Sequence, residues 1–522
     1  MAGIALRGGK AVDPALEPDA DVTAWLAVAA GTLGALMATL DISIVNSALP
    51  TIQGEIGASG TEGTWVATAY LVAEIIVIPL AAWLERIFGL RSFLLVATVL
   101  FTFFSMMCGM ATSLGMMIIG RVGQGFTGGA MIPTAQTIIA QRLPPHQQPI
   151  GISLFGMVAI MGPVIGPLVG GWLTENMSWH YAFFINLPIS ILLVLLLLLG
   201  LNHEKARLFL LRDADWCGIA GLALGLGGLT VMLEEGQRDQ WFDSAFIRTM
   251  AFVAVVGFTL IAIGQMRAKK PVVKLRLLRD RQFGSVALMG IILGAVLYGT
   301  SFVIPQFLAS VAGYNALQSG KVVLLAGIPS LLMMPFVPFL IRTVDIRIAV
   351  AFGLMMMAAS AYADSTLTVL SDGSDFVASQ LLRGVGQILA MLFLSQAVVR
   401  SVPRADAGDA AGLFNAIRNL GGSFALAGVA VLQDQRVWHH SRRLEESLSA
   451  NSVAVQDMVA SLGGRFGSEA TALRALAGQI QKQALVMTYN DIFWVLGLGT
   501  LLVLPLVMFL RPLPGVNGRP RP

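Results

Sequence analysis

Long apolar stretches alternate with short polar connections along the whole chain of 522 residues. A stretch of about 20 apolar residues can cross ~30 Å of membrane hydrocarbon as one helix. The pattern predicts fourteen such helices, in groups of six, two and six. The first six lie near residues 24–46, 64–84, 92–111, 115–140, 150–172 and 180–201. The others lie near 215–235 and 247–266, then 282–311, 319–341, 346–367, 374–401, 410–433 and 486–510.

Composition points to the same class, an all-α integral membrane protein. Hydrophobic residues make up 56% of the chain and charged residues 12%, against roughly 45–50% and 25% in soluble domains. The formal net charge of +4 is too small to suggest a nucleic-acid partner. Cys108 lies in an apolar stretch and Cys217 near a basic one, so no disulfide is expected.

Basic residues concentrate in alternate connections, and this sets the expected orientation, because such residues stay on the cytoplasmic side during insertion. We expect cytoplasmic tails at 1–23 and 511–522, both termini inside, and a multi-pass protein of the cell inner membrane. The basic residues of the expected inner connections include Arg86, Arg91, Arg142, Lys205, Arg207, Arg212, the run from Arg267 to Arg281, Arg342, Arg347, Arg400 and Arg404.

Residues 434–485 also contain basic residues. They follow the thirteenth of the predicted spans, however, and since the chain changes sides with each span from an inside N-terminus, we expect them outside, as a periplasmic loop before the last helix. A loop of this length is only weakly governed by the charge rule. Its apolar residues are spaced among charges, which predicts amphipathic helices that dock a partner; a solvated hairpin without a partner is the alternative. These apolar residues are Leu444, Leu448, Val455, Met458 and Leu462.

Two six-helix bundles, 24–201 and 282–510, flank a linker pair at 215–266. GRVGQGFTGG at 120–129 is echoed by LRGVGQ at 382–387, which indicates a diverged parallel repeat, as in transporters with two related halves. Arg383 and Gln387 therefore occupy positions in the second half that correspond to part of the 120–129 motif.

Asp41 is the first ionisable candidate inside the membrane, where a charged group costs about 2.5–3.5 kcal/mol and needs a partner or a water-filled cavity. It shares a helix face with Ala30, Gly34 and Ala38, and such small residues let another helix approach closely. A desolvated carboxylate favours its protonated form, so Asp41 could carry a proton. The alternative is a structural carboxylate bonded to the backbone or to Asn46.

Glu74 is the second proton-carrier candidate, one turn after Tyr70. The alternative is a glutamate that reaches a cavity without titrating. Glu234, Glu235 and Asp364 lie near predicted helix ends, where we expect them to be solvated.

Arg121 shares a face with Gln124, Gly125, Gly128 and Gln136, a composition that suits a central cavity. Arg121 could pair with Asp41 or Glu74, and protonation of the acid would release the pair as a switch; a static salt bridge is the alternative. The residues expected to line the substrate cavity are Tyr70, Gln124, Gln136, Gln387 and Asn415. In the thirteenth span, Arg418 and Asn419 are expected to contact the opposing half, the cytoplasmic gate or the substrate.

The fifth span reads GPVIGPLVGG at 162–171. Glycines four residues apart predict close helix packing, and prolines interrupt backbone hydrogen bonds, so we expect a kinked, tightly packed helix. The residues of this pattern are Gly162, Pro163, Gly166, Pro167, Gly170 and Gly171.

These motifs resemble the fourteen-helix drug:proton antiporter branch of the major facilitator superfamily, above all EmrB-type multidrug efflux transporters. The resemblance covers nearly the whole chain. It is carried by LDISIVNSALPTIQ (40–53), GRVGQGFTGG (120–129), GPVIGPLVGG (162–171), WHYAFFINLPI (179–189), GQRDQWF (236–242), FNAIRNLGGS (414–423) and NDIFWVL (490–496).

The resemblance implies an antiporter that exports hydrophobic or amphiphilic compounds by alternating access, with the proton gradient as energy source and no cofactor. Arg121 corresponds to the arginine linked to proton coupling, alongside Asp41 and Glu74, and 162–171 to the antiporter motif. The implied partners are an EmrA-type membrane fusion protein as periplasmic adaptor and a TolC-like outer-membrane channel.

One motif departs from the family pattern. Between the second and third spans, AAWLERIFGLR (81–91) keeps Gly89 and Arg91 but has Glu85-Arg86 where the family usually has an Asp-Arg pair. With Arg418, these four residues are the expected cytoplasmic gate.

Two other functions remain open at this point. A nutrient or metabolite proton symporter, or a facilitator, can use the same fold. A sensor or membrane enzyme is disfavoured, because the chain has no nucleotide loop, nucleophile motif or metal-spaced His/Cys cluster; His439 and His440 lack ligand spacing.

Overall fold

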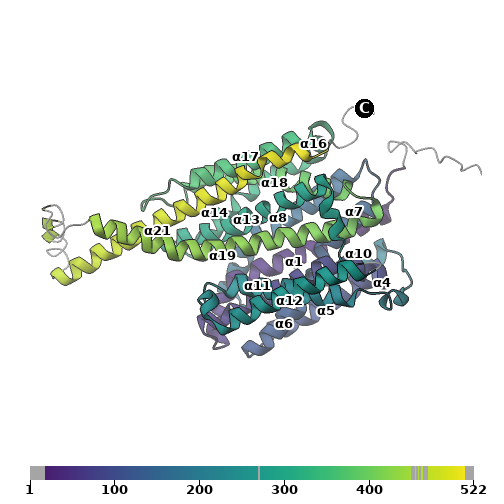
Figure 1. Cartoon of the computed structure of the whole chain (residues 1–522), viewed down its shortest axis with the longest axis horizontal. Helices are drawn as coiled ribbons and strands as arrows, with labels where there is room; N and C mark the ends of the chain where they lie inside the picture. Colours follow the sequence, from purple (N-terminus) through teal and green to yellow (C-terminus); the bar gives the residue numbers. More distant parts are fainter. Residues whose placement is uncertain are drawn as a thin grey trace, which may run out of the picture.

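Every regular element in the described part of the chain is a helix (Figure 1). The computed structural model describes residues 18–268, 271–447, 453, 456–457, 460–461 and 468–511, so the tail residues 1–17 and 512–522 lie outside it. The first group comprises α1 (Val22–Glu55), α2 (Gly60–Gly63), α3 (Trp65–Val77), α4 (Ala81–Phe88), α5 (Leu90–Gly109), α6 (Leu114–Gly128), α7 (Met131–Arg142), α8 (Gln148–Asn176), α9 (Tyr181–Phe184) and α10 (Asn186–Gly200).

The linker pair is α11 (Trp216–Glu235) and α12 (Ala245–Arg267). The last group comprises α13 (Arg281–Ser310), α14 (Ala316–Leu324), α15 (Gly327–Met333), α16 (Val337–Thr343), α17 (Ile346–Asp364), α18 (Phe376–Arg400), α19 (Ala407–Ser447) and α21 (Glu469–Leu502). Short 3-10 turns are η2 (Ile78–Leu80), η3 (Leu208–Leu211), η4 (Trp241–Asp243), η5 (Leu275–Arg279), η6 (Met334–Phe336), η7 (Arg404–Asp406) and η8 (Leu504–Phe509).

Among the described residues, 12 helical segments are long and apolar enough to cross a membrane. The two other predicted spans are helical as well but fall outside that class. The span at 115–140 is divided into α6 and α7, and the span at 410–433 is the first part of α19, which carries Asn415, Arg418 and Asn419.

Prolines act differently in different helices. Pro79 lies in the 3-10 turn between α3 and α4, where its missing N–H weakens the α-helical hydrogen-bond ladder. Helix α8, by contrast, continues from Gln148 to Asn176 with Pro163 and Pro167 inside it. Close packing along its glycines compensates for the hydrogen bonds that the prolines remove.

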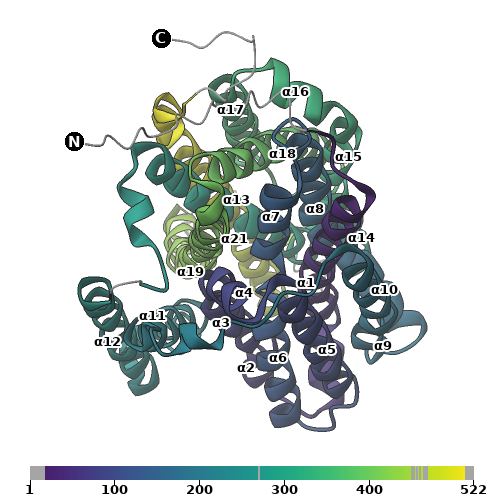
Figure 2. The same ribbon diagram turned by 90° about the vertical axis from the view of Figure 1, so that its right-hand side faces the viewer.

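The two six-helix groups pack against each other, and the linker pair lies at one side of them (Figure 2). Helix α11 contacts α3 of the first group and α19 of the second, while α8 contacts α14, α15 and α16. The linker pair is therefore attached to both groups at once.

One end of the bundle carries many basic residues and both ends of the described chain, and we call it the basic side. There, the backbone N–H of Ala20 donates to Gln147 at 3.1 Å, and Arg511 lies 3.7 Å from Asp280. At the opposite end, α19 and α21 project beyond the other helices (Figure 1).

The projecting helices contain most of the described residues of segment 434–485. Residues 434–447 and 469–485 simply continue α19 and α21. Arg436 and His440 of α19 both contact Asp491 of α21, at 2.8 and 2.7 Å, so the two helices are joined where they leave the bundle. Leu448, Val455, Met458 and Leu462 lie outside the described residues.

Candidate functional site

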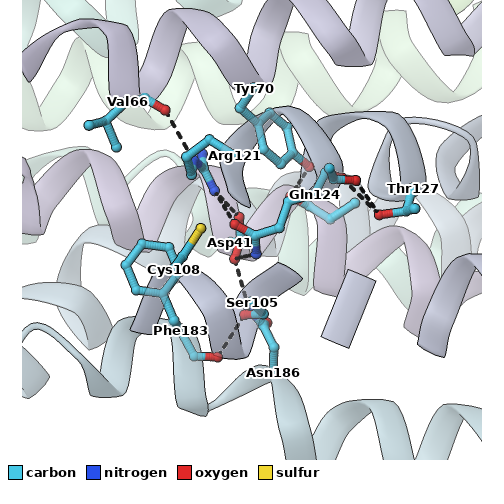
Figure 3. Close-up of polar contacts among 12 residues, drawn as sticks. Asp41, Val66, Tyr70, Ser105, Cys108, Arg121, Gln124, Thr127, Phe183 and Asn186 are labelled. Atoms are coloured by element: carbon cyan, nitrogen blue, oxygen red, sulfur yellow. Dashed lines mark hydrogen bonds and ion pairs between the residues drawn. The ribbon is translucent and has the colours of Figure 1, made fainter. Parts of the chain in front are cut away.

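A buried ion pair lies in the middle of the first six-helix group (Figure 3). Arg121 of α6 donates from Nη1 to Oδ2 of Asp41, on α1, at 2.5 Å, and neither side chain is exposed. Of the two acids that the sequence offered as partners, the arginine thus pairs with Asp41. Because a buried charge without its partner costs several kcal/mol, the two residues are held together strongly.

Two amides complete the hydrogen bonding of the carboxylate. Oδ1 of Asp41 accepts from Nε2 of Gln124 at 3.0 Å and from Nδ2 of Asn186 at 2.7 Å (Figure 3). Asn186 also donates to Ser105, which in turn donates to the backbone oxygen of Phe183. Helices α1, α5, α6 and α10 therefore meet at this one carboxylate, and a change in its charge would affect all four.

Arg121 has further contacts that fix its position. Its Nε donates to the backbone oxygen of Val66 at 3.0 Å, and its guanidinium lies 4.3 Å from the centre of the Tyr70 ring. Its Nη2 is buried without a hydrogen-bond partner. Tyr70 and Gln124, expected to line a substrate cavity, are fully buried and support the ion pair.

The small residues of α1 lie at different distances from the neighbouring helices. A side chain at Gly34 would meet Met131 and Leu193 only at the ordinary distance of 3.5 Å. Helix α8 also approaches the backbone of α1 closely, at its own glycines. A β-carbon at Gly166 would lie 3.2 Å from the backbone of Ser43, and one at Gly170 would lie 2.6 Å from the Ile44 oxygen.

The other motif glycines divide into two kinds. A β-carbon at Gly162 would lie 2.7 Å from Cβ of Thr39, whereas one at Gly171 would meet nothing within 4 Å. Gly162, Gly166 and Gly170 thus form the contact with α1, and Gly171 does not.

Glu74 lies apart from the ion pair, on the side of α3 that faces α11 and α19. It is 2% exposed, and its Oε2 is buried without a hydrogen-bond partner. It lines a cavity of about 20 Å³ together with Leu71, Ile75, Thr230, Glu234, Tyr298, Asn419, Ser423 and Leu426.

The expectation that three acids near helix ends are solvated is wrong. Glu235 and Asp364 are each 1% exposed, and Glu234 faces the cavity beside Glu74. Helix α11 packs its last turn against α3 and α19, which buries Glu235 and half-buries Glu234. Asp364, the last residue of α17, faces Arg383 of α18.

A cluster of charges closes the basic side between the two groups; we call Arg86, Lys274, Asp406 and Asp409 the latch. Nη1 of Arg86 contacts both carboxylate oxygens of Asp409 at 2.9 Å. Lys274 lies 2.7 Å from Asp409 and also contacts Asp406. Burial opposes the charge of Lys274, yet the hydrogen bonds to both aspartates outweigh it and raise the pKa of Lys274.

The other expected gate residues lie around the latch or deeper. Thr134 donates to Glu85, which links α4 to α7. Gly89 ends α4 with φ of +76°, a conformation that favours glycine, and Arg91 follows in α5. Arg418, nine positions beyond Asp409 and thus about 14 Å along α19, acts on Glu74 and Tyr298 instead.

Polar residues other than those of the latch also connect the two groups. Asn415 of α19 donates to Gln136 of α7 at 3.0 Å, and both are buried. Arg400 donates to the backbone oxygen of Pro145 at 3.0 Å. Gln387 lies on α18 and is 8% exposed. With the latch, these contacts hold the groups together on the basic side.

Sequence reasoning missed several residues of these sites. Asn186 lies in the WHYAFFINLPI motif, so an amide inside an apolar stretch was the available signal. Asp409, Lys274 and Asp406 lie at helix starts and loops, where charged residues are ordinary, and nothing in the sequence distinguishes them.

The comparisons agree with this architecture. The model of the Major Facilitator Superfamily matches residues 31–426. The chain is 32% identical to the colistin resistance protein EmrB of Acinetobacter baumannii, over 91% of this chain and 94% of that protein. It is 33% identical to the multidrug export protein EmrB of Escherichia coli K12, over 93% and 95%.

A solved structure shares the fold. The proton:xylose symporter XylE, bound to 6-bromo-6-deoxy-D-glucose, covers 94% of this chain and 96% of its own with a TM-score of 0.61 at 15% identity. This likeness concerns the fold alone. Together, the family match, the full-length relatives and the membrane-spanning helices show that the chain belongs to the Major Facilitator Superfamily as an EmrB-type, multi-pass membrane transporter and not an enzyme.

Proposed function

We propose that this transporter exports toxic hydrophobic or amphiphilic organic compounds in exchange for protons, by alternating access. The observation that carries the proposal is the wholly buried Asp41–Arg121 pair, on which four helices converge. The names of full-length relatives, multidrug export and colistin resistance proteins, support export over uptake. The proton gradient supplies the energy, and no cofactor is needed.

The ion pair provides a physical route for coupling. A proton that reaches Asp41 neutralises the carboxylate and leaves the Arg121 charge buried without compensation, which favours a rearrangement of α1 against α6. The latch joins the two groups on the basic side in this structure, and such a contact would keep a substrate path closed there. Protonation and latch opening would then alternate during a transport cycle.

The proposed orientation places the basic side and both termini in the cytoplasm, because basic connections are retained inside during insertion. The chain then lies in the inner membrane, and α19 and α21 project into the periplasm. This projection would be the docking surface for an EmrA-type adaptor, which connects to a TolC-like outer-membrane channel.

A resistance screen tests export. Cells that lack their own efflux pumps and express the chain are exposed to diverse toxicants, with and without a protonophore. Protonophore-sensitive resistance that Asp41→Asn abolishes supports the proposal; the control is Glu175→Gln, an exposed acid. Undiminished resistance in Asp41→Asn would refute proton coupling at this site, and uptake that external acid accelerates would favour a nutrient symporter.

The docking surface has a separate test. Co-purification with an adaptor from the same membrane is expected for the full chain and is lost when residues 448–467 are replaced by a short Gly/Ser linker. Retained co-purification and retained efflux in that variant would count against the adaptor proposal.

A further inference from the structure

The cavity beside Glu74 lies where three parts of the protein meet. Its lining comes from α3 of the first group, from α11 of the linker pair, and from α13 and α19 of the second group. With a volume of about 20 Å³, it has room for roughly one or two water molecules. It is too small for an organic substrate in this conformation.

Polar atoms without partners face this space. Oε2 of Glu74 and Oγ1 of Thr230 are both buried and have no hydrogen-bond partner, and the two side chains are 2% and 1% exposed. Across the cavity, Oε1 of Glu234 accepts a hydrogen bond from Oγ of Ser423 at 2.8 Å. Two carboxyl groups from different parts of the chain thus line one small cavity.

Positive charge is scarce around the two carboxyl groups. From α19, the guanidinium of Arg418 acts on Glu74, and from α13 the Tyr298 hydroxyl lies near both acids. The next residue on α11, Glu235, accepts a hydrogen bond from Thr68 and forms an ion pair with Arg238. On α6, Arg121 also acts on Glu74, but its charge is already paired with Asp41.

Helix α12, the other neighbour of α11, adds no charge at the cavity. Its charged residues are Arg248 near its start and Arg267 at its end, and neither lines the space. The two carboxylates therefore face one guanidinium, that of Arg418, that is not already paired with another acid. Since an uncompensated charge inside the membrane is costly, one more positive charge is required, and a proton is the cation that fits the space.

We propose that Glu74 and Glu234 form a second proton-binding site, which holds one proton between them and makes linker helix α11 part of the proton-coupling machinery. The role in coupling rests on the proposed antiport function; proton binding itself does not. No bond other than O–H is made or broken, and water in the cavity can pass the proton from one carboxyl group to the other.

The position of the site connects proton binding to movement. Glu74 belongs to the first group, whereas Glu234 is bonded to Ser423 of the second. When the two groups move relative to each other, the separation of the carboxyl groups changes, and so does the electrostatic cost of leaving both charged. The site would take up a proton when the acids are close and release it when they separate.

Infrared difference spectroscopy of the full chain in lipid nanodiscs, titrated with acid, measures carboxyl protonation without any substrate. Because Glu234→Gln removes a neighbouring negative charge, we expect the protonation midpoint of Glu74 to move to lower pH by about one unit, a tenfold change in proton affinity. Glu74→Gln should shift Glu234 in the same direction. The matched control is Glu235→Gln, read at Glu74 alone, because the Glu235 carboxylate is paired with Arg238 and acts on the neighbouring Glu234.

The proposal would be overturned by an unchanged protonation midpoint of Glu74 in Glu234→Gln. It would also be overturned if Glu235→Gln shifted the midpoint of Glu74 by the same amount. Spectra of the two single variants that sum to the wild-type band would overturn it as well, because independent groups do not share a proton. Retained monodispersity and unfolding temperature of each variant exclude misfolding. Proton-driven export in the wild type, measured separately, tests the proposed function, so the two ideas can fail independently.

Discussion

Replacing Asp41 by asparagine tests the central ion pair most directly. The substitution keeps the size of the side chain but removes the charge that compensates Arg121, and both side chains are completely buried. The new amide would also face the donors of Gln124 and Asn186. Breaking a buried pair by removing one partner costs about 3–5 kcal/mol, so we expect a loss of that size in the free energy of unfolding and a loss of efflux.

A double-mutant cycle separates stability from function. Replacing Arg121 by methionine in the Asp41→Asn background removes the orphaned charge, because apolar residues can replace a buried pair at little cost. We expect the double variant to be more stable than either single one, with a coupling energy of more than about 3 kcal/mol, and to remain inactive in efflux. Unfolding in detergent micelles measures the stability. Additive effects, or a single variant that costs less than about 1 kcal/mol, would refute the reasoning.

Three further predictions concern packing and the latch. Gly166→Ala should cost about 1–3 kcal/mol through overpacking against Ser43, whereas Gly171→Ala, which meets nothing within 4 Å, should cost little in the same unfolding assay; equal losses would contradict the packing account. Asp409→Asn should destabilise the closed latch by about 1–2 kcal/mol, less than for a fully buried pair because the cationic partners of Asp409 are partly exposed. It should also increase the distance between spin labels on α4 and α19. An unchanged distance distribution would exclude a role for the latch. The pKa of Lys274 is raised, so its contribution to the stability of the latch is complete below its unfolded pKa of about 10.4 and is lost only as the pH rises through the higher folded pKa. The distances between the spin labels should therefore stay constant from pH 6 to 9 in a buffered series. Lys274→Gln should open the latch across this range.

The sequence alone determined the class of fold and the most important charges. Hydropathy is a property of consecutive residues, so the apolar stretches were visible without any knowledge of packing, and all fourteen predicted spans coincide with helices. Asp41 and Arg121 were recognisable because ionisable residues are rare inside such stretches. The glycines of 162–171 were recognisable as a packing surface by their spacing.

The tertiary structure decided which of these residues meet. Asp41 and Arg121 are 80 positions apart, and Arg86 and Asp409 are 323 positions apart; no local pattern specifies such pairs. The same holds for Glu234: its position at a helix end predicts a solvated side chain, but the fold packs α11 against α3 and α19. Burial of a charge, and therefore its chemistry, depends on neighbours that only the folded chain brings together.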